Sequence, residues 1–495
     1  MSIIKKQAIG HAIITYAGLL LGVVNLLWLM PKGMLPEEVG LRSIILSSAL
    51  LISPLARIGF TKVIIKFYPH FRSEEKKDHG FLFFILIIPL IGFLLMVVLF
   101  LLFRNQINEI FVHKAALLNK YILYIIPISF FLMYTGIFAT YSQVRYKIIV
   151  PALIQNIGMN VFTGILLFLL NRGYIDFNGF MKLLVLCYFL ATLLNLINIG
   201  RLKLLHLKPD FSFITKKIAK EMLVYGVFVI IGGVGAIIST NISSLMLGAM
   251  EGLRNTAIFS IAYFLGTVID IPRGSLSRIT SPVIAEAWHT DKLAVIKNIY
   301  KKTAINQMIV GSFIFLIIWL NIDNIFHFIP RGEIYQGGKW VVFYIGLAKV
   351  IDMATGVNTE ILINSDKYKF NFIAVITFTI FVVLMNWILI PIYSYIGAAL
   401  ALMIAFTYFN FVKFIYLLIK FKLQPFSWNF LKVLIIAIVV YIVVSFIPEL
   451  TNPFMDILLK SFIICLLFAG SVMLFNPSED IKKIQMQIGK IFKTG

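Results

Sequence analysis

The sequence is poor in the residues that build disulfide frameworks, zinc sites and nucleotide-binding loops. It contains two cysteines, Cys187 and Cys465, which lie in separate apolar runs and form no CxxC pair. This pattern excludes a disulfide framework. No GxxxxGK[ST] motif is present, which excludes the phosphate-binding loop of ATPases, and the seven histidines form no HxxEH-type pair. We therefore expect no enzyme site, no metal site and no cofactor.

Charged residues are also scarce. They make up 13% of the 495 residues, whereas hydrophobic residues make up 60%, and the mean hydropathy is +0.94. Soluble domains are about 45–50% apolar, and a soluble chain of this length would need polar surfaces for two or more domains. Strand-like alternation with the period of a membrane barrel is absent. The composition therefore predicts an all-α polytopic membrane protein.

Fourteen segments are apolar enough to cross a bilayer as helices, which takes about 20 residues each. The first apolar run, from Ala8 to Met30, is longer than the core of a signal peptide and has no small-residue cleavage site, so we expect it to be retained. The segments are 8–30, 39–60, 81–103, 117–141, 148–170, 180–200, 220–247, 255–281, 303–321, 339–362, 370–391, 395–419, 429–447 and 456–475.

Positive charge sorts by side of the membrane. The formal net charge is +22. Twenty-seven Lys and Arg residues lie in segments on the side of the N-terminus, against seven on the opposite side. The positive-inside rule places the basic side in the cytoplasm, and an even number of spans places both termini there. The charge is thus a topology signal, and we expect no nucleic-acid partner.

The chain contains a faint internal repeat. The stretch "KKQAIGHAIITYAGLLLG" (5–22) resembles "KKIAKEMLVYGVFVIIGG" (216–233), and "SQVRYK" (142–147) resembles "NSDKYK" (364–369) at a similar offset. A steady offset predicts two six-helix lobes in parallel repeat. The predicted domains are an N-lobe at 1–208, a C-lobe at 209–424, two further helices at 425–476 and an amphipathic tail at 477–495, which we expect on the cytoplasmic membrane surface.

Two arginines lie late in apolar segments, at equivalent places in the repeat. Arg57 follows Pro54 in "LISPLAR", and Arg273 follows Pro272 in "IDIPRG". Charge inside a membrane is costly and usually faces a wet cavity or a charged partner. Two other interpretations stay open: the arginines snorkel to the headgroups, or Arg273 pairs with Asp270, three residues earlier on the same helical face.

Other intramembrane cations give weaker signals. Arg42 lies in the second segment, and Arg278 lies closer to the end of the eighth, where snorkelling is expected. Five lysines lie nearer to helix ends or on apolar faces, and we expect them to snorkel as well: Lys120, Lys182, Lys413, Lys432 and Lys460.

The tenth segment carries a stripe of charge. Lys349, Asp352, Gly356 and Glu360 follow one another at spacings of three, four and four, which places them on one face of one helix. Lys349 and Asp352 can neutralise each other, and Glu360 lies near the cytoplasmic end. The stripe is either part of a cavity wall or an ionic contact between helices.

Four stretches resemble the polysaccharide-type flippases of the multidrug/oligosaccharidyl-lipid/polysaccharide exporter superfamily. They are "YGVFVIIGG" (225–233), "IPRGSLSRITSPVIAEAW" (271–288), "YKKTAINQ" (300–307) and "GVNTEILINSDKYKFN" (356–371). The resemblance implies two lobes around a central cavity. It also implies translocation, by alternating access, of undecaprenyl-pyrophosphate-linked oligosaccharide from the cytoplasmic to the periplasmic leaflet of the bacterial inner membrane.

The resemblance also implies site residues. Relatives that flip the peptidoglycan precursor carry functional arginines in helices 2 and 8, where this chain has Arg57 and Arg273, and also in helix 1, where it has none. This difference favours a surface-polysaccharide intermediate of O-antigen type. Those relatives use a sodium site with acidic ligands in helices 7, 11 and 12, where this chain offers Asn241, Asn386 and Thr407. Coupling to a proton or sodium gradient therefore stays open.

The expected site has two parts. The substrate-binding residues are Arg57 and Arg273, together with Arg278 and Arg42, and the charges that tune the cavity are Asp270, Lys349, Asp352 and Glu360. The expected partners are the lipid-linked oligosaccharide, membrane lipid and the polymerase or glycosyltransferase machinery of polysaccharide synthesis. Four alternatives remain: a drug/cation antiporter of the same superfamily, a lipid II flippase, a polymerase or ligase with a large periplasmic loop, and a scaffold that transports nothing.

Overall fold

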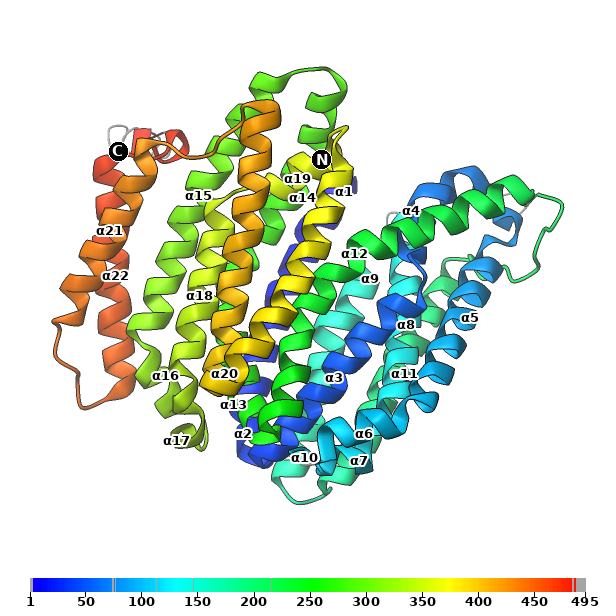
Figure 1. Cartoon of the computed structure of the whole chain (residues 1–495), viewed down its shortest axis with the longest axis horizontal. Coiled ribbons are helices and arrows are strands. Elements are labelled where there is room, and N and C mark those ends of the chain that lie inside the picture. The colour runs from blue at the N-terminus through cyan, green and yellow to red at the C-terminus, as the bar shows by residue number, and fades with distance from the viewer. Residues whose placement is uncertain are drawn as a thin grey trace. The chain divides into compact units, whose positions relative to one another are not determined.

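The computed structural model describes residues 3–73, 75, 77–112, 114–145, 147–213, 215–482 and 485–486, and every regular element in these ranges is helical (Figure 1). The chain forms two compact units, Met1–Ala257 (unit 1) and Ile258–Gly495 (unit 2). This boundary follows from contacts, and it lies beyond residue 208, where the internal repeat divides the chain. The division into repeat-based lobes stays a prediction.

Unit 1 contains the helices of the first half of the chain and the long helix α12. Its elements are α1 (Ile3–Val23), η1 (Val24–Leu29), α2 (Met30–Gly33), α3 (Pro36–Ala56), α4 (Phe60–Phe71), η2 (Lys77–Gly80), α5 (Phe81–Leu102), α6 (Arg104–Val112), α7 (Leu117–Tyr121), η3 (Ile122–Tyr124), α8 (Ile125–Val144), α9 (Ile149–Ala152), η4 (Leu153–Gly158), α10 (Met159–Asn171), α11 (Phe177–Arg201) and α12 (Lys216–Glu251). Helix α13 (Leu253–Thr267) crosses the boundary between the units.

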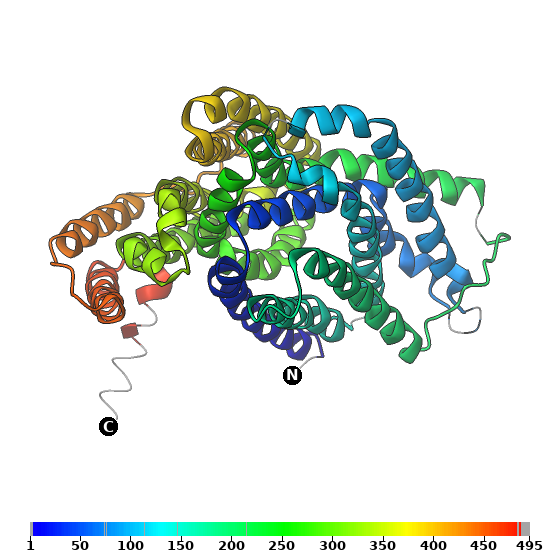
Figure 2. The same ribbon diagram turned by 90° about the horizontal axis from the view of Figure 1, so that it is seen from below.

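Unit 2 contains the remaining helices. They are η5 (Val268–Asp270), α14 (Ile271–His289), α15 (Leu293–Leu320), α16 (Ile322–Phe328), α17 (Gly332–Tyr335), η6 (Gln336–Gly338), α18 (Lys339–Ala354), α19 (Asn358–Asn364), α20 (Tyr368–Phe421), α21 (Trp428–Ser445) and α22 (Pro453–Phe475). Helices α21 and α22 pack side by side and against α15 (Figure 2). Of the predicted tail 477–495, residues 483–484 and 487–495 lie outside the described residues.

The helices confirm a multi-pass membrane protein. Among the described residues, eleven helices are long and apolar enough to cross a membrane, or up to twelve if a bent pair counts as one span. The sequence predicts fourteen segments, and part of the difference arises because two of them, 370–391 and 395–419, share the 54-residue helix α20. Ser394, with φ 52° and ψ −130°, breaks the helical geometry between these two segments.

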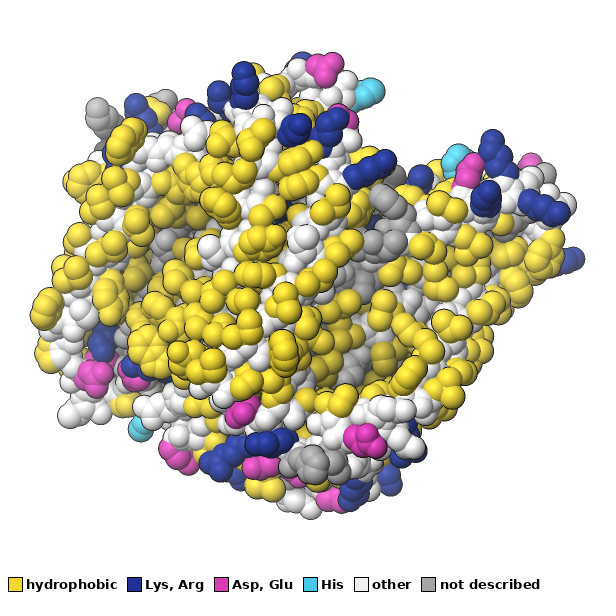
Figure 3. All heavy atoms as spheres, in the orientation of Figure 1, with side chains coloured by type: hydrophobic (Ala, Val, Ile, Leu, Met, Phe, Trp, Pro, Cys, Tyr) yellow, Lys and Arg dark blue, Asp and Glu magenta, His cyan; other side chains and the backbone are white. Residues whose placement is uncertain are grey.

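Apolar side chains cover the flanks of the helices in each unit, and charged side chains gather towards the helix ends (Figure 3). Helix α21 illustrates this pattern, because Leu431, Ile435, Ile438 and Ile442 are each about half exposed. Such stripes are unfavourable in water and mark a surface that meets lipid.

The chain turns sharply between α3 and α4. Helix α3 ends at Ala56, four residues before the end of the predicted segment 39–60, and Gly59 adopts a left-handed conformation with φ 71°. A Cβ atom on Gly59 would lie 2.2 Å from the carbonyl oxygen of Gly226 on α12, so only glycine fits there. Arg57 is therefore the C-terminal cap of α3 and does not lie within a helix.

Two predicted segments of unit 2 are also interrupted. The segment 255–281 changes to 3-10 geometry at η5 within one helical span, Leu253–His289, and Arg273 lies in the turn that follows η5. The segment 339–362 bends by 51° between α18 and α19. Gly356 forms this bend with φ +61°, and a Cβ atom on it would lie 3.0 Å from Ala304. The single straight stripe expected for Lys349 to Glu360 is therefore wrong, because Glu360 lies beyond the bend.

Candidate functional site

The predicted charges of unit 2 come together at one place. Arg273 Nη1 donates to Asp352 Oδ2 on α18 and lies 3.8 Å from Asp270 Oδ1. Lys349 Nζ lies 3.4 Å from Asp270 Oδ2. Lys349 thus pairs with Asp270 of η5, and Asp352 pairs with Arg273 of α14. The sequence had suggested instead that Lys349 and Asp352 neutralise each other. The pairing of Asp270 with Arg273 is confirmed, at a long distance.

Neutral polar residues extend this cluster, and sequence reasoning missed them. Asn410 on α20 donates to Asp352 Oδ1 at 2.8 Å. The side-chain oxygen of Asn410 accepts hydrogen bonds from Thr355 at 2.9 Å and Asn358 at 3.0 Å. The bend at Gly356 places Thr355 and Asn358 beside α20. Asp352 is therefore held from two helices at once.

Lys413 is the most deeply buried cation of this cluster. It has no exposed surface, and its Nζ donates to Asn358 Oδ1 and Thr359 Oγ1, each at 2.9 Å. The prediction that Lys413 snorkels to the membrane surface is therefore wrong. The available signal was its spacing, because Asn410 and Lys413 lie three residues apart on one helical face of an otherwise apolar run.

Of the other four lysines that were expected to snorkel, one is buried and three are exposed. Lys460 on α22 is 6% exposed and forms a 2.7 Å ion pair with Asp456, so the snorkelling prediction is wrong for it too. Lys120, Lys182 and Lys432 are exposed, as that interpretation requires.

The cluster of unit 2 balances its formal charges. Glu360 on α19 accepts a hydrogen bond from Ser277 on α14. We call the three cations and three carboxylates the unit 2 charge cluster: Arg273, Lys349 and Lys413 with Asp270, Asp352 and Glu360. Buried charges are tolerated when they are paired and hydrogen-bonded.

Unit 1 differs, because its two candidate site arginines, Arg57 and Arg42, have no carboxylate partner in the described residues, whereas Arg145 pairs with Asp78 at 2.7 Å. Arg57 Nη2 donates to Ser53 Oγ at 2.7 Å and to the carbonyl oxygen of Leu132 at 3.1 Å. Its guanidinium lies against Gly136, where a Cβ atom would come within 2.5 Å of Nη1. None of the ion pairs in the part of the chain that the structure describes includes Arg57.

Arg42 and Arg278 complete the predicted set. Arg42 is half-buried on α3, its Nη1 lies 4.0 Å from the sulfur of Met30, and its Nε has no hydrogen-bond partner in the described residues. No described ion pair includes it either. Arg278 is exposed on α14 and lies outside the unit 2 charge cluster as the described contacts define it.

Arg57 and Arg273 lie in different backbone settings. Arg57 caps the C-terminus of α3, where the helix dipole favours a cation, whereas Arg273 follows the 3-10 turn η5 inside the continuous helical span Leu253–His289. Their environments therefore differ, although the internal repeat makes them equivalent. No group of three or more His, Cys, Asp or Glu side chains in the described ranges is arranged to hold a metal ion.

Comparisons with known proteins identify the family. The model of the family described as "Polysaccharide biosynthesis protein" matches residues 4–288. No curated protein sequence matches the chain. Among solved structures, the lipid II flippase MurJ in an inward closed conformation matches with a TM-score of 0.69 and 18% identity, over 94% of this chain and 98% of that chain.

Two transporters of the MOP superfamily give the same fold. A multidrug resistance MATE transporter in an inward-facing conformation matches with a TM-score of 0.62 and 13% identity, over 82% of this chain and 97% of its own. A transporter from Pyrococcus furiosus, described as having a binding pocket of reverse polarity, matches with a TM-score of 0.53 and 14% identity, over 84% of this chain and 94% of its own. The family match confirms the resemblance seen in the sequence: the chain belongs to the polysaccharide biosynthesis protein family, and it shares its fold with MurJ and with MATE transporters.

Proposed function

We propose that the protein is a flippase for a polyprenyl-pyrophosphate-linked oligosaccharide, a surface-polysaccharide intermediate of O-antigen type. It would act in the bacterial inner membrane, with both termini in the cytoplasm, and move its substrate to the periplasmic leaflet by alternating access. The family implies a lipid-linked polysaccharide precursor as the substrate. The bias of Lys and Arg to one side of the membrane supports the orientation.

One observation carries the proposal: Arg57 holds a positive charge in a helical membrane unit with no carboxylate partner in the described residues. A guanidinium forms strong, paired hydrogen bonds to phosphate oxygens. In unit 2, by contrast, Arg273 is already paired with Asp352, and Lys349 with Asp270. We therefore assign the first contact with the pyrophosphate to Arg57, and we give Arg273 a contact only when Asp352 releases it.

Arg42 is a second anion contact on the same helix. It lies fifteen residues before Arg57, which corresponds to about 22 Å along an α-helix. This separation is too large for both arginines to bind one pyrophosphate together. Because α3 is predicted to run towards the cytoplasm, Arg57 would meet the substrate on the cytoplasmic side and Arg42 would meet it nearer to the periplasm.

The alternatives fit the structure less well. A drug/cation antiporter would need a carboxylate that faces its cationic substrate, but Asp270 and Asp352 are both paired with cations of the chain. The lipid II flippase remains the second candidate, because MurJ shares the fold. The first predicted span, 8–30, contains no arginine, and this absence favours the surface-polysaccharide substrate.

The test is a set of single substitutions in a strain that lacks its chromosomal copy. We would compare Arg57→Gln with Lys432→Gln, which removes an exposed cation on α21, at matched protein levels. Surface polysaccharide and lipid-linked oligosaccharide on the cytoplasmic face would be measured. We expect Arg57→Gln to reduce export about tenfold or more, because a hydrogen bond to a charged group contributes about 1.5–3 kcal/mol, and to cause the precursor to accumulate.

Two outcomes would contradict the proposal. Unchanged export in Arg57→Gln would mean that this arginine only stabilises the turn after α3. Rescue by the wild-type protein of cells depleted of their lipid II flippase, without any effect on surface polysaccharide, would replace the proposed substrate with lipid II.

A further inference from the structure

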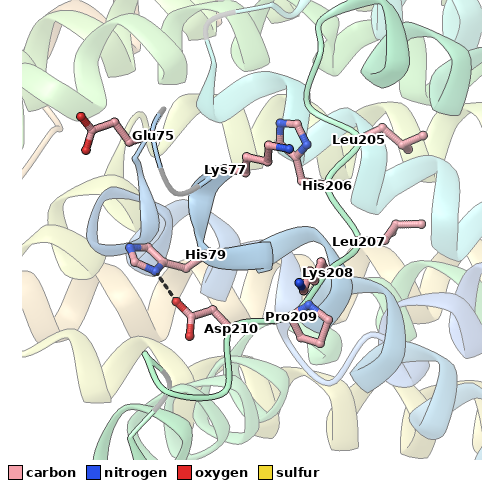
Figure 4. A pocket seen from close by; sticks show the side chains of 9 residues that line it. All are labelled: Glu75, Lys77, His79, Leu205, His206, Leu207, Lys208, Pro209 and Asp210. Carbon is pink, nitrogen blue, oxygen red and sulfur yellow. Dashed lines mark hydrogen bonds and ion pairs between the residues drawn. The ribbon is translucent and has the colours of Figure 1, made fainter.

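A cavity at one end of unit 1 lies apart from the arginines of α3. Its volume is about 590 Å³. One wall comes from the turn at η2, which carries Lys77 and His79, and the other comes from residues 205–210, between α11 and α12 (Figure 4). Both walls are connections between membrane helices, so the cavity lies at the level of the lipid headgroups. The basic side of the membrane, predicted as cytoplasmic, contains both of these connections.

The second wall is amphipathic. Residues 204–210 form neither helix nor strand, and the backbone N–H of His206 donates to the carbonyl oxygen of Leu204 at 3.0 Å, which turns the chain at Leu205. Figure 4 shows His206 and Lys208 on the side that faces Lys77, with Leu205 and Leu207 on the opposite side. The two leucines are 46% and 50% exposed. One short segment thus presents basic groups to the cavity and apolar groups away from it.

The acidic residue of the cavity is already engaged. Asp210 Oδ2 lies 2.8 Å from His79 Nδ1, and Oδ1 accepts the backbone N–H groups of Ser212 at 3.1 Å and Phe213 at 3.2 Å. The hydrogen bond with His79, followed by that with Ser212, lowers the pKa of Asp210 to about 2. Glu75, the other acid that lines the cavity, is exposed.

The ammonium groups of the two cavity lysines, Lys77 and Lys208, can bind an anion, because no described carboxylate is paired with them. Both side chains are exposed, so neither is committed to a buried contact.

The walls are fixed to each other before any ligand binds. The ring of His79 stacks on Phe213 with centroids 3.7 Å apart, and the backbone N–H of Asp210 donates to the carbonyl oxygen of His79 at 3.3 Å. Gly80, with φ +65°, allows the chains to touch, because a Cβ atom there would lie 2.1 Å from the carbonyl oxygen of Lys208. A cavity held in this way loses little conformational entropy when it binds a ligand.

We propose that this cavity binds the phosphate of an anionic phospholipid headgroup. Lys77 and Lys208 contact the phosphate, His206 lines the same side, and Leu205 and Leu207 enter the adjoining acyl region. Basic pockets at the membrane surface bind anionic headgroups in this manner. The exposed leucines favour a lipid over a free phosphate ion, because a soluble anion gives them no apolar contact.

The test measures lipid binding to the purified full chain. Phosphatidylglycerol and phosphatidylcholine with identical acyl chains would be titrated and followed by native mass spectrometry, with inorganic pyrophosphate as a third probe. We expect a preference for phosphatidylglycerol, which Lys77→Gln/Lys208→Gln weakens about 30-fold, since each lysine near the surface contributes about 1 kcal/mol. The matched control Lys217→Gln/Lys220→Gln removes two exposed lysines of α12 that do not line the cavity and should bind as the wild type does.

A second variant separates the two sources of phosphate. Leu205→Gln/Leu207→Gln should weaken phosphatidylglycerol binding and leave any pyrophosphate binding unchanged. The proposal is overturned if phosphatidylcholine binds equally well or if the two lysine variants behave alike. It is also overturned if pyrophosphate binds as tightly as phosphatidylglycerol and the leucine variant binds both as the wild type does. Unfolding temperatures of all variants would show that they fold.

Discussion

Arg273 and Asp352 form an ion pair that joins the first turn of α14 to the buried face of α18. Asp352 is 2% exposed and also accepts a hydrogen bond from Asn410 on α20. Three helices of unit 2 therefore meet at one carboxylate. This arrangement makes the charge of Arg273 part of the packing of its unit and leaves Arg57 as the better candidate for an anionic substrate.

The first prediction concerns this carboxylate. Asp352→Asn should destabilise the protein by about 3 kcal/mol, the lower end of the range for breaking a buried pair, because it leaves the half-buried Arg273 beside an amide. The pair Lys339–Asp323 supplies the control: its side chains are 33% and 44% exposed, so Asp323→Asn should cost about 1 kcal/mol or less. Thermal unfolding in detergent would compare the two variants. Similar losses would mean that the Arg273–Asp352 pair behaves as a surface pair.

The second prediction concerns coupling within the same pair. Because the cost of Asp352→Asn comes from an uncompensated cation, Arg273→Gln in the same chain should restore part of the lost stability. A double-mutant cycle in the same unfolding assay would measure this recovery. Strictly additive losses would show that the two groups do not share an interaction.

The third prediction concerns Lys413. Lys413→Met leaves Asn358 Oδ1 and Thr359 Oγ1 without their donor, but it also removes the need to bury an ammonium group. We expect a loss of about 1–3 kcal/mol, no larger than that of Asp352→Asn. Lys432→Met, at an exposed site of α21, should change stability by no more than about 0.5 kcal/mol. Equal effects of the two lysine substitutions would argue against the buried position of Lys413.

The fourth prediction separates two reasons why a position requires glycine: a positive φ angle, and a neighbouring atom too close to admit a Cβ atom. Gly59 and Gly173 both have positive φ, 71° and 75°, but only Gly59 has a close neighbour at its Cβ position. Gly173→Ala should therefore cost about 1 kcal/mol of backbone strain, and Gly59→Ala should cost clearly more because of the clash with Gly226. Unfolding temperatures would rank the two variants. The reverse order would contradict the tight turn between α3 and α4.

The fifth prediction concerns pH. The pKa of Asp210 is lowered from its usual value of 3.8 to about 2. A carboxylate with a lowered pKa stabilises the fold above pH 3.8, and this contribution disappears as the pH falls through about 2. In His79→Ala the pKa of Asp210 should move back towards 3.8, which infrared titration of the isotopically labelled carboxylate would detect. A pKa that stays near 2 would assign the effect to Ser212 and Phe213 alone.

Particular residues show how far the sequence predicted the site. Arg57, Arg273 and the charges of the tenth segment were found because charge is conspicuous inside apolar runs. The sequence suggested the pair of Asp270 with Arg273, but not the pair of Asp270 with Lys349, because these two residues lie far apart in the chain and meet only through helix packing. The burial of Lys413 was missed because a lysine in an apolar run looks alike in sequence whether it is buried or snorkels, and the spacing from Asn410 was the one signal that could have separated the two cases.

The sequence by itself determined a multi-pass helical membrane protein with most of its positive charge on one side, because hydrophobicity and charge sorting act on each segment separately. The tertiary structure alone decided which charges are neutralised. Whether one charged side chain neutralises another depends on distances of a few ångströms between helices that are far apart in the sequence. The breaks after Ala56 and at Gly356 contribute to those distances: among the described residues Arg57 has no carboxylate partner, whereas Arg273 lies beside Asp270 and Asp352.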